Sequence, residues 1–175
     1  DRVKAAGTPP VTRVVFHYPN DSVRISIKPA AGVTALYAPR RTVLDQIIAD
    51  AAMEAGAEVR FQTTVTEVLR HASGGVMGVA GIDSGGRSFQ ATAPLTVGAD
   101  GIRSIVARSV AAPVVRTGSS ASAVLYGYWD KLPTEGYEWL YAPGAAAGLI
   151  PTNDGQTGVF VSTTRKRMRA ARSAG

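Results

Sequence analysis

The stretch LTVGADGIRSIVAR, residues 95–108, is the part of the sequence that decides the fold. Its apolar first half is typical of a buried strand, and the Asp-Gly pair at 100–101 breaks that pattern. The spacing of apolar residues after the break predicts a helix. We therefore expect a short, fully buried strand at 94–99 and a helix at about 102–109. In open α/β sheets, ligands bind beyond the carboxyl ends of such strands.

Asp100 and Gly101 would have different uses in a ligand site at this position. The carboxylate can accept hydrogen bonds from sugar or ribityl hydroxyls, and the glycine lets the backbone approach a phosphate closely. The start of the following helix presents free N–H groups and the positive end of its dipole. The alternative is a simple turn that binds nothing, since Asp-Gly is also a common turn sequence.

A second informative stretch, YAPRRTVLD at residues 37–45, leads into the clearest helix of the sequence. Apolar residues recur there with the 3.6-residue period, which predicts a helix over 42–55. Thr42 followed by Asp45 is an approximate capping box, and Gly56 can adopt the left-handed conformation that ends a helix.

Arg40 and Arg41 stand at the start of this predicted helix. The planar fork of donors in a guanidinium group matches phosphate oxygens. The alternative is that the two arginines only solvate the helix end. Because positive charge at a helix N-terminus opposes the helix dipole, the pair favours an anionic partner.

Most of the remaining sequence predicts strands. Alternating apolar and polar residues between turn sequences indicate strands at 11–18, 22–28, 57–62, 65–70, 76–82, 88–91, 121–130, 137–142, 146–151 and 158–163. Helices lie between the strands in the middle of the chain, and only strands follow Pro113. The sequence therefore predicts a mixed α/β fold that combines an α/β domain with an antiparallel sheet.

Taken together, the two stretches resemble the flavoprotein aromatic hydroxylases, the FAD-dependent monooxygenases similar to para-hydroxybenzoate hydroxylase. The motifs that carry the resemblance are RTVL at 41–44, AGA at 55–57, VTEV at 65–68 and VGADGIRSIVAR at 97–108. The resemblance covers residues 28–110 well. Over 111–163 it is looser, with GLIP at 148–151 as the main match.

The resemblance implies a division of the chain by function. Residues 29–110 would be part of a Rossmann-like FAD/NAD(P)-binding domain. Residues 1–28 and 111–164 would form an antiparallel substrate-binding sheet, and 165–175 would be a basic tail.

The resemblance also implies site residues and a reaction. Arg41 would contact the ribityl–phosphate region of FAD, and the backbone at Val65 would lie near the adenine. Asp100 and Gly101 would help to hold the dinucleotide. FAD would be reduced by NAD(P)H, and one oxygen atom of O2 would then pass to an aromatic or polyketide-like small molecule. The flavin supplies that chemistry, and the resemblance identifies no catalytic residue in this sequence.

Two motifs of the family have no counterpart here. The family begins with a βαβ unit that carries Gly-x-Gly-x-x-Gly, whereas the glycines at 75, 78 and 81 lie in a strand pattern with no helix after it. A later Gly-Asp motif is also missing. We therefore expect the middle of a larger enzyme, whose other segments are its partners. We expect this part alone to hold FAD poorly and to be inactive.

Aromatic residues alternate along two of the predicted strands. Tyr126 and Tyr128 share a face of one strand, and Tyr137, Trp139 and Tyr141 share a face of another. Such faces can line an apolar cavity for a small-molecule substrate. Ordinary sheet packing is the alternative. If the segments that normally cover these faces are absent, exposed apolar surface would drive self-association.

The composition of the 175 residues excludes several classes of site. Without cysteine there are no disulfides, thiolate metal sites or cysteine nucleophiles. His17 and His71 cannot make a three-histidine site, so we expect no metal. Either histidine could act as a base, with a packing or surface role as the alternative. We find neither an apolar run that could span a membrane nor a signal peptide, so we expect a cytoplasmic protein without a membrane partner.

The net charge of +6 is concentrated near residue 175. Residues 165–175 hold five cationic side chains and no acid, which leaves +1 for the rest of the chain. Because no basic face extends over the domain, we expect no nucleic-acid partner.

Two other functions fit the same residues. One is a flavin-dependent reductase or halogenase, since related dinucleotide-binding folds share the Asp-Gly element. The other is a non-catalytic module derived from this fold that only binds small molecules.

Overall fold

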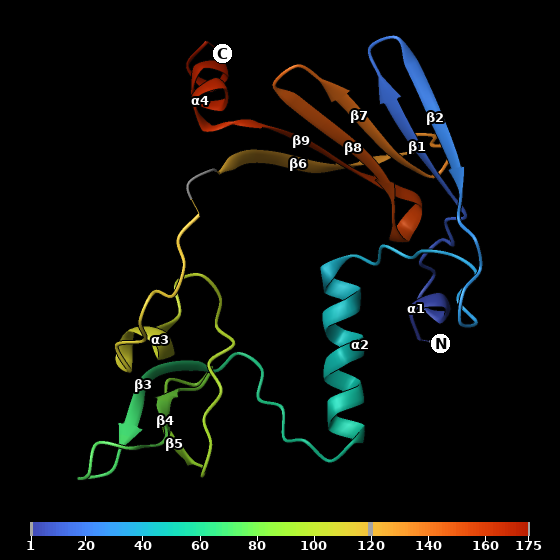
Figure 1. The fold of residues 1–175 in the computed structure, drawn as a ribbon. Coiled ribbons are helices and arrows are strands. Elements are labelled where there is room, and N and C mark those ends of the chain that lie inside the picture. Colours follow the sequence, from blue (N-terminus) through green and yellow to red (C-terminus); the bar gives the residue numbers. More distant parts are fainter. Residues whose placement is uncertain (1, 119–120, 175) are drawn as a thin grey trace. The chain divides into compact units, whose positions relative to one another are not determined.

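The computed structural model describes residues 2–118 and 121–174. The chain forms two compact units (Figure 1). We call residues 1–57 with 118–175 the sheet unit, and residues 58–117 the meander unit. Each unit is described by itself.

The sheet unit contains a six-stranded sheet with the order β2-β1-β7-β8-β9-β6. Its strands are β1 (Arg13–Tyr18), β2 (Asp21–Ser26), β6 (Ser122–Asp130), β7 (Tyr137–Ala142), β8 (Ala145–Pro151) and β9 (Gln156–Thr164). β1 pairs in parallel with β7, and the other neighbours are antiparallel. The predicted mixed α/β fold with an antiparallel sheet is confirmed.

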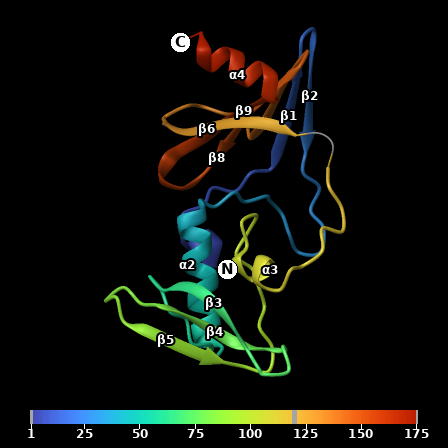
Figure 2. The same cartoon turned by 90° about the vertical axis from the view of Figure 1, so that its left-hand side faces the viewer.

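Helices flank the strands of this unit along the chain. They are α1 (Arg2–Ala5), α2 (Arg41–Glu54), the short 3-10 helix η1 (Asn153–Gly155) and α4 (Arg165–Ser173). Arg2 forms an ion pair with Glu54, which ties α1 to the end of α2. β9 runs directly into α4 (Figure 2), where the Thr164 hydroxyl accepts a hydrogen bond from the N–H of Arg167 at 3.2 Å. The basic tail is therefore helical.

The prediction of helix α2 is confirmed, but its predicted cap is wrong. Arg40, not Thr42, is the N-cap residue, and no side chain caps the helix. Asp45 does not reach back to the helix start because it accepts two hydrogen bonds from Arg41, at 2.9 and 3.0 Å. Gly56 has φ +91, the left-handed conformation expected after the helix.

The core of the sheet unit is partly polar. Its buried apolar residues are Val11, Val15 and Ala35. Asn153, at 1% exposure, is buried more deeply than Val11 and Ala35 and nearly as deeply as Val15. Its side-chain amide donates to the carbonyl of Ala6 at 2.9 Å and to the Thr8 hydroxyl at 3.0 Å.

The same Asn153 side chain also receives a hydrogen bond. Its Oδ1 accepts from the N–H of Arg40 at 3.0 Å. The neighbouring Thr152 hydroxyl donates to the carbonyl of Ala38 at 2.7 Å. Two residues of the β8–β9 turn thus hold both the segment after α1 and the loop before α2.

The meander unit is built around three antiparallel strands in sequence order. They are β3 (Thr64–Arg70), β4 (Val76–Ile82) and β5 (Ser88–Thr92), followed by helix α3 (Ile105–Ser109). Gly81 on β4 allows a close approach between the strands. A Cβ atom there would lie 2.1 Å from the carbonyl oxygen of Thr64 and 2.7 Å from Cε1 of Phe89.

Two predicted strands do not form. Residues 57–62 end in a turn with Gln62 in the left-handed conformation (φ +51), which breaks an extended strand. Residues 94–99 are not buried: Leu95 is 76% and Val97 75% exposed. No strand among the described residues pairs with either segment, so the hydrogen-bond ladder that defines a strand is missing.

The division by function that the sequence predicts stays a prediction. By compactness alone, α2 belongs with the six-stranded sheet and not with β3, β4 and β5, although both lie within the predicted FAD-binding part at 29–110.

We predict that Asn153→Ala lowers the free energy of unfolding by about 3 kcal/mol. The substitution removes three hydrogen bonds and leaves buried partners unsatisfied. Urea denaturation followed by circular dichroism measures the change. Gln46→Ala is the control, because it removes a single exposed bond to Asp50 and should change the free energy by less than about 0.5 kcal/mol.

Candidate functional site

A cavity of about 280 Å3 lies in the sheet unit, and we call it the aromatic cavity. It is lined by Ala38, Pro39, Arg40, Arg41, Val124, Tyr126, Gly127, Tyr128, Ile150, Thr152, Gly158, Val159 and Phe160. The structure therefore brings together one predicted cofactor residue, Arg41, and two predicted substrate residues, Tyr126 and Tyr128. The two tyrosine rings meet edge to face, with centroids 6.4 Å apart.

Arg41 is well exposed at this cavity. Its side chain is 82% exposed, and its guanidinium group forms a two-pronged ion pair with Asp45 one helical turn later. The hydrogen bond from Arg41 lowers the pKa of Asp45 below its ordinary value. An exposed pair of this kind contributes little to stability. Arg41 can therefore exchange Asp45 for a phosphate at small cost.

Arg40 is held by the wall of the aromatic cavity, and its side chain is only 30% exposed. Its guanidinium carbon lies 4.6 Å from the ring centroid of Tyr128. Nη1 donates to Gln156 Oε1 at 2.9 Å and lies 3.7 Å from an oxygen of Asp154. Sequence analysis named only Arg41 as a cofactor residue, and the structure gives the two arginines different surroundings.

The three aromatic residues predicted on β7 do not line this cavity. Trp139 packs edge to face on Phe160, with centroids 5.6 Å apart. Tyr141 stacks on Tyr18 beside a separate cavity of about 490 Å3. Burial raises the pKa of Tyr137, whose hydroxyl has no hydrogen-bond partner among the residues that the structure describes.

The meander unit holds the other predicted cofactor residues. Val65 and Asp100 line one cleft of about 650 Å3, which also includes the segment from Leu95 to Ala99 and the start of α3. Gly101, next to this lining, has φ +78, so a side chain there would be strained. The structure thus brings Val65 and Asp100 together in one unit, and Arg41 belongs to the other.

The Asp100 carboxylate is engaged by the protein itself. Oδ2 accepts hydrogen bonds from the N–H groups of Ile105 at 2.6 Å and Val106 at 3.3 Å. Ser104 caps the same helix by accepting from the N–H of Ala107 at 2.9 Å. The predicted free N–H groups at this helix start are therefore covered by Asp100. The Asp-Gly pair forms a turn that borders the cleft, and its role in binding a ligand stays a prediction.

Gly98 explains another part of the same motif. A Cβ atom on this residue would lie 2.7 Å from Cβ of Val106. The chain before the Asp-Gly turn therefore packs directly on α3, and only glycine allows this approach.

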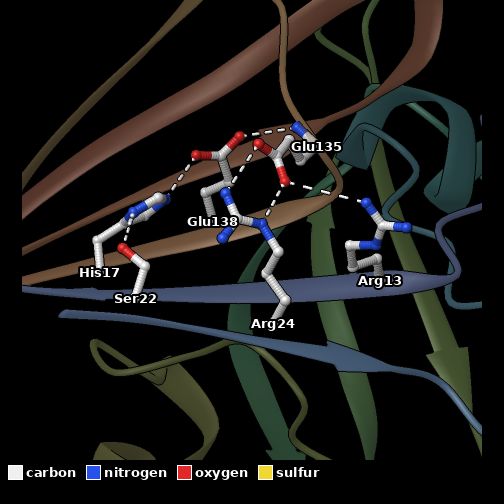
Figure 3. A network of polar contacts seen from close by, with 6 residues as sticks. All are labelled: Arg13, His17, Ser22, Arg24, Glu135 and Glu138. Atoms are coloured by element: carbon white, nitrogen blue, oxygen red, sulfur yellow. Dashed lines mark hydrogen bonds and ion pairs between the residues drawn. The ribbon is translucent and has the colours of Figure 1, made fainter.

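His17 belongs to a polar network on β1, β2 and β7 (Figure 3). Its Nδ1 lies 3.0 Å from the Ser22 hydroxyl, and its Nε2 lies 2.8 Å from Glu138 Oε2. Glu135, in the turn before β7, pairs with Arg24 at 2.8 Å, and this hydrogen bond lowers the pKa of Glu135. The network links three strands, which corresponds to the packing role considered for His17.

The residues present fit a flavin dinucleotide in their chemistry. The aromatic cavity offers flat, apolar walls and an exposed guanidinium group, which suit a planar ring joined to a phosphate. The cleft of the meander unit is larger and mostly apolar, with Asp100 as its charged group. That Arg41, Val65, Asp100 and Gly101 hold the cofactor stays a prediction.

Neither a metal site nor a membrane span is found in the described chain. Within residues 2–118 and 121–174, no three His, Asp or Glu side chains come together as metal ligands. No helix of these segments has the length and apolar character that crossing a membrane requires.

The capping of α3 gives a prediction about pH. The Ser104 hydroxyl and the backbone N–H groups of α3 lower the pKa of Asp100 below its ordinary value. Because this pKa is lower in the folded state, ionised Asp100 stabilises the cap in full above about pH 4. The stabilisation is lost as the pH falls through the pKa of Asp100 in the folded state. We predict that Ser104→Ala raises the pKa of Asp100, measured by NMR titration of the carboxyl carbon. The pKa of Asp45 should not change, which makes it the internal control. An unchanged pKa of Asp100 in Ser104→Ala would contradict the role of Ser104.

Comparisons with known proteins agree with this fold. A solved flavoprotein/dehydrogenase from Cytophaga hutchinsonii has a TM-score of 0.79 at 18% identity, over 97% of this chain and 43% of that one. The myxobacterial chondrochloren halogenase, described as a variant of FAD-dependent halogenases, has a TM-score of 0.76 at 20% identity, over 95% and 40%. A probable FAD-dependent monooxygenase from Pseudomonas aeruginosa has a TM-score of 0.73 at 20% identity, over 96% of this chain and 46% of that one.

The chain thus spans less than half the length of these structures. No protein of curated function matches it. The model of the family described as FAD binding domain matches residues 1–174. With this match over nearly its whole length, the chain belongs to the FAD-binding domain family.

Proposed function

We propose that this chain is part of an FAD-dependent monooxygenase that hydroxylates an aromatic or polyketide-like small molecule with NAD(P)H and O2. The observation that carries the proposal is the aromatic cavity. There Arg41, at the start of α2, lines the same cavity as Tyr126 and Tyr128 of β6. A cationic group for a cofactor phosphate and aromatic walls for a flat ring therefore meet within one unit.

The residues of the chain would act by binding the cofactor. Arg41 would supply a planar pair of donors to phosphate oxygens in place of its ion pair with Asp45. Tyr126, Tyr128 and Phe160 give the cavity apolar surfaces on which a flat ring can pack. When bound, FAD supplies the redox chemistry that activates oxygen.

Asp100 and Gly101 would contribute through the backbone of their turn. Since the Asp100 carboxylate already caps α3, it fixes the turn in place. The absence of a side chain at Gly101 leaves the peptide of that turn open to the dinucleotide, and Val65 forms another wall of the cleft.

A flavin-dependent halogenase or reductase is the second candidate. The chain is similar to the chondrochloren halogenase and, with a TM-score of 0.73, to a geranylgeranyl bacteriochlorophyll reductase-like protein from Thermoplasma acidophilum. At 19–20% identity these likenesses show the fold alone. Product analysis with and without halide distinguishes halogenation from hydroxylation.

The proposal also includes the location of the protein in the cell and its partners. We place the enzyme in the cytoplasm, with a small-molecule substrate and with further segments of the enzyme as partners. The exposed apolar residues of the described chain, among them Leu95, Val97, Val114 and Val115, would be covered by such segments. Without that cover we expect self-association, which light scattering would measure.

An FAD titration followed by calorimetry tests the proposal. We expect weak but saturable binding, weakened further by about tenfold in Arg41→Ala, which removes a charged donor, and in Asp100→Ala, which releases the turn at Gly101 from α3. Arg87→Ala is the matched control, since Arg87 is 85% exposed and also pairs with an aspartate four residues away. No saturable binding, or equal affinity in all four proteins, would refute the proposal.

A further inference from the structure

We propose that Arg40 is a positioning residue, which holds Arg41 in place for the flavin phosphate without touching the flavin itself. The inference rests on the proposed function, because it concerns the same cofactor. Both arginines line the aromatic cavity, and a simple interpretation would make both of them phosphate ligands. The contacts of Arg40 indicate instead that the two arginines have different roles.

The first step of the argument is that the Arg40 side chain is already committed. Its guanidinium group lies over Tyr128, donates to Gln156 and lies near Asp154. Gln156 is itself fixed, because its Nε2 donates to Asp130 Oδ1 at 2.9 Å and thereby turns Oε1 toward Arg40. Nη1 of Arg40 is thus engaged, and its side chain is 30% exposed, in contrast to the 82% exposed side chain of Arg41.

The second step is that Arg40 also joins the backbone of the sheet to that of α2. Its N–H donates to the buried Asn153 side chain at 3.0 Å. Its carbonyl accepts hydrogen bonds from the N–H groups of Val43 and Leu44, both at 2.9 Å. Arg40 is therefore held on one side by the β8–β9 turn and starts the helix on the other.

The third step concerns Arg41, the next residue. Its Cα follows the position of Arg40 directly, so the contacts of Arg40 with β6 and the β8–β9 turn fix where the exposed guanidinium group begins. Loss of the Arg40 side chain would remove the contacts with Tyr128, Gln156 and Asp154 that lie next to Arg41, and the nearest remaining attachments would be the backbone bond to Asn153 and the bond from Thr152 to Ala38. The first turn of α2 would then fluctuate, and Arg41 would be less well placed for a phosphate.

Amide hydrogen exchange of the chain without FAD tests the first part. In Arg40→Ala we expect exchange at Val43 and Leu44 to rise at least tenfold, while the middle of α2 and the whole of β4 stay unchanged. Arg41→Ala should not increase exchange at these two amides to the same extent, because Arg41 pairs only with Asp45 in this structure. Unchanged exchange in Arg40→Ala would overturn the inference.

A double-mutant cycle on FAD affinity tests the second part. If Arg40 acts through Arg41, Arg40→Ala weakens FAD binding about tenfold in the wild-type background and has little further effect in Arg41→Ala. The effects of Arg40→Ala and of Asp100→Ala, which lies in the other unit, on the free energy of FAD binding should be additive. Additive effects of Arg40→Ala and Arg41→Ala would show an independent flavin contact and overturn the inference.

Conservative variants keep the test valid if Arg40→Ala does not fold. Arg40→Lys retains the charge but loses the planar fork. Gln156→Leu keeps Arg40 and removes the acceptor of its hydrogen bond at 2.9 Å, together with the bond from Gln156 to Asp130. Both should show the same non-additivity with Arg41→Ala, and full FAD affinity in both would overturn the inference. Wild-type protein that binds no FAD would refute the proposed function. Normal wild-type binding with an additive cycle would refute the positioning role alone.

Discussion

The side chain of Asn153 is the contact on which the sheet unit most depends. One buried amide joins three segments that are far apart in the sequence, the residues after α1, the loop before α2 and the β8–β9 turn. Few large apolar side chains are buried among the described residues of this unit. These hydrogen bonds therefore hold together segments that a larger apolar core holds in other proteins. The location of the helix that bears Arg41, and hence the shape of the aromatic cavity, follows from them.

Much of the fold could be predicted from the sequence because the pattern was local. The 3.6-residue period of α2, the turns between β3, β4 and β5, and the strands after Pro113 all depend on neighbouring residues. The segments at 57–62 and 94–99 have the composition of strands, but a strand also needs a partner, and pairing is not a local property. The predicted Thr42 cap is wrong for a local reason, because the helix begins one residue earlier, with Arg40 as N-cap, and Arg41 binds the carboxylate of Asp45.

The site was predicted less completely than the fold. Alternation placed Tyr126 and Tyr128 on one face of a strand, and in the structure both line the same cavity as Arg41; their role in binding a substrate stays a prediction. Asn153 was missed because Asn-Asp-Gly reads as an ordinary turn, and no pattern shows that its amide faces three distant backbone and side-chain partners. A polar residue that follows an apolar strand and precedes Asp-Gly is a signal that could prompt such a search. The different surroundings of Arg40 and Arg41 can be seen only in three dimensions.

The parallel pairing of β1 with β7 has a consequence for how the protein folds. Val14 is paired with Tyr137, so the sheet cannot be completed until the ribosome has made most of the chain. The meander unit is continuous in sequence and contains only short-range pairings, so it can fold first during synthesis. Until β7 is made, the β1–β2 hairpin is a two-stranded ribbon, and the edge of β1 that later pairs with β7 is unpaired. Slow translation between residues 58 and 117 would lengthen this unpaired stage and favour the capture of the hairpin by chaperones.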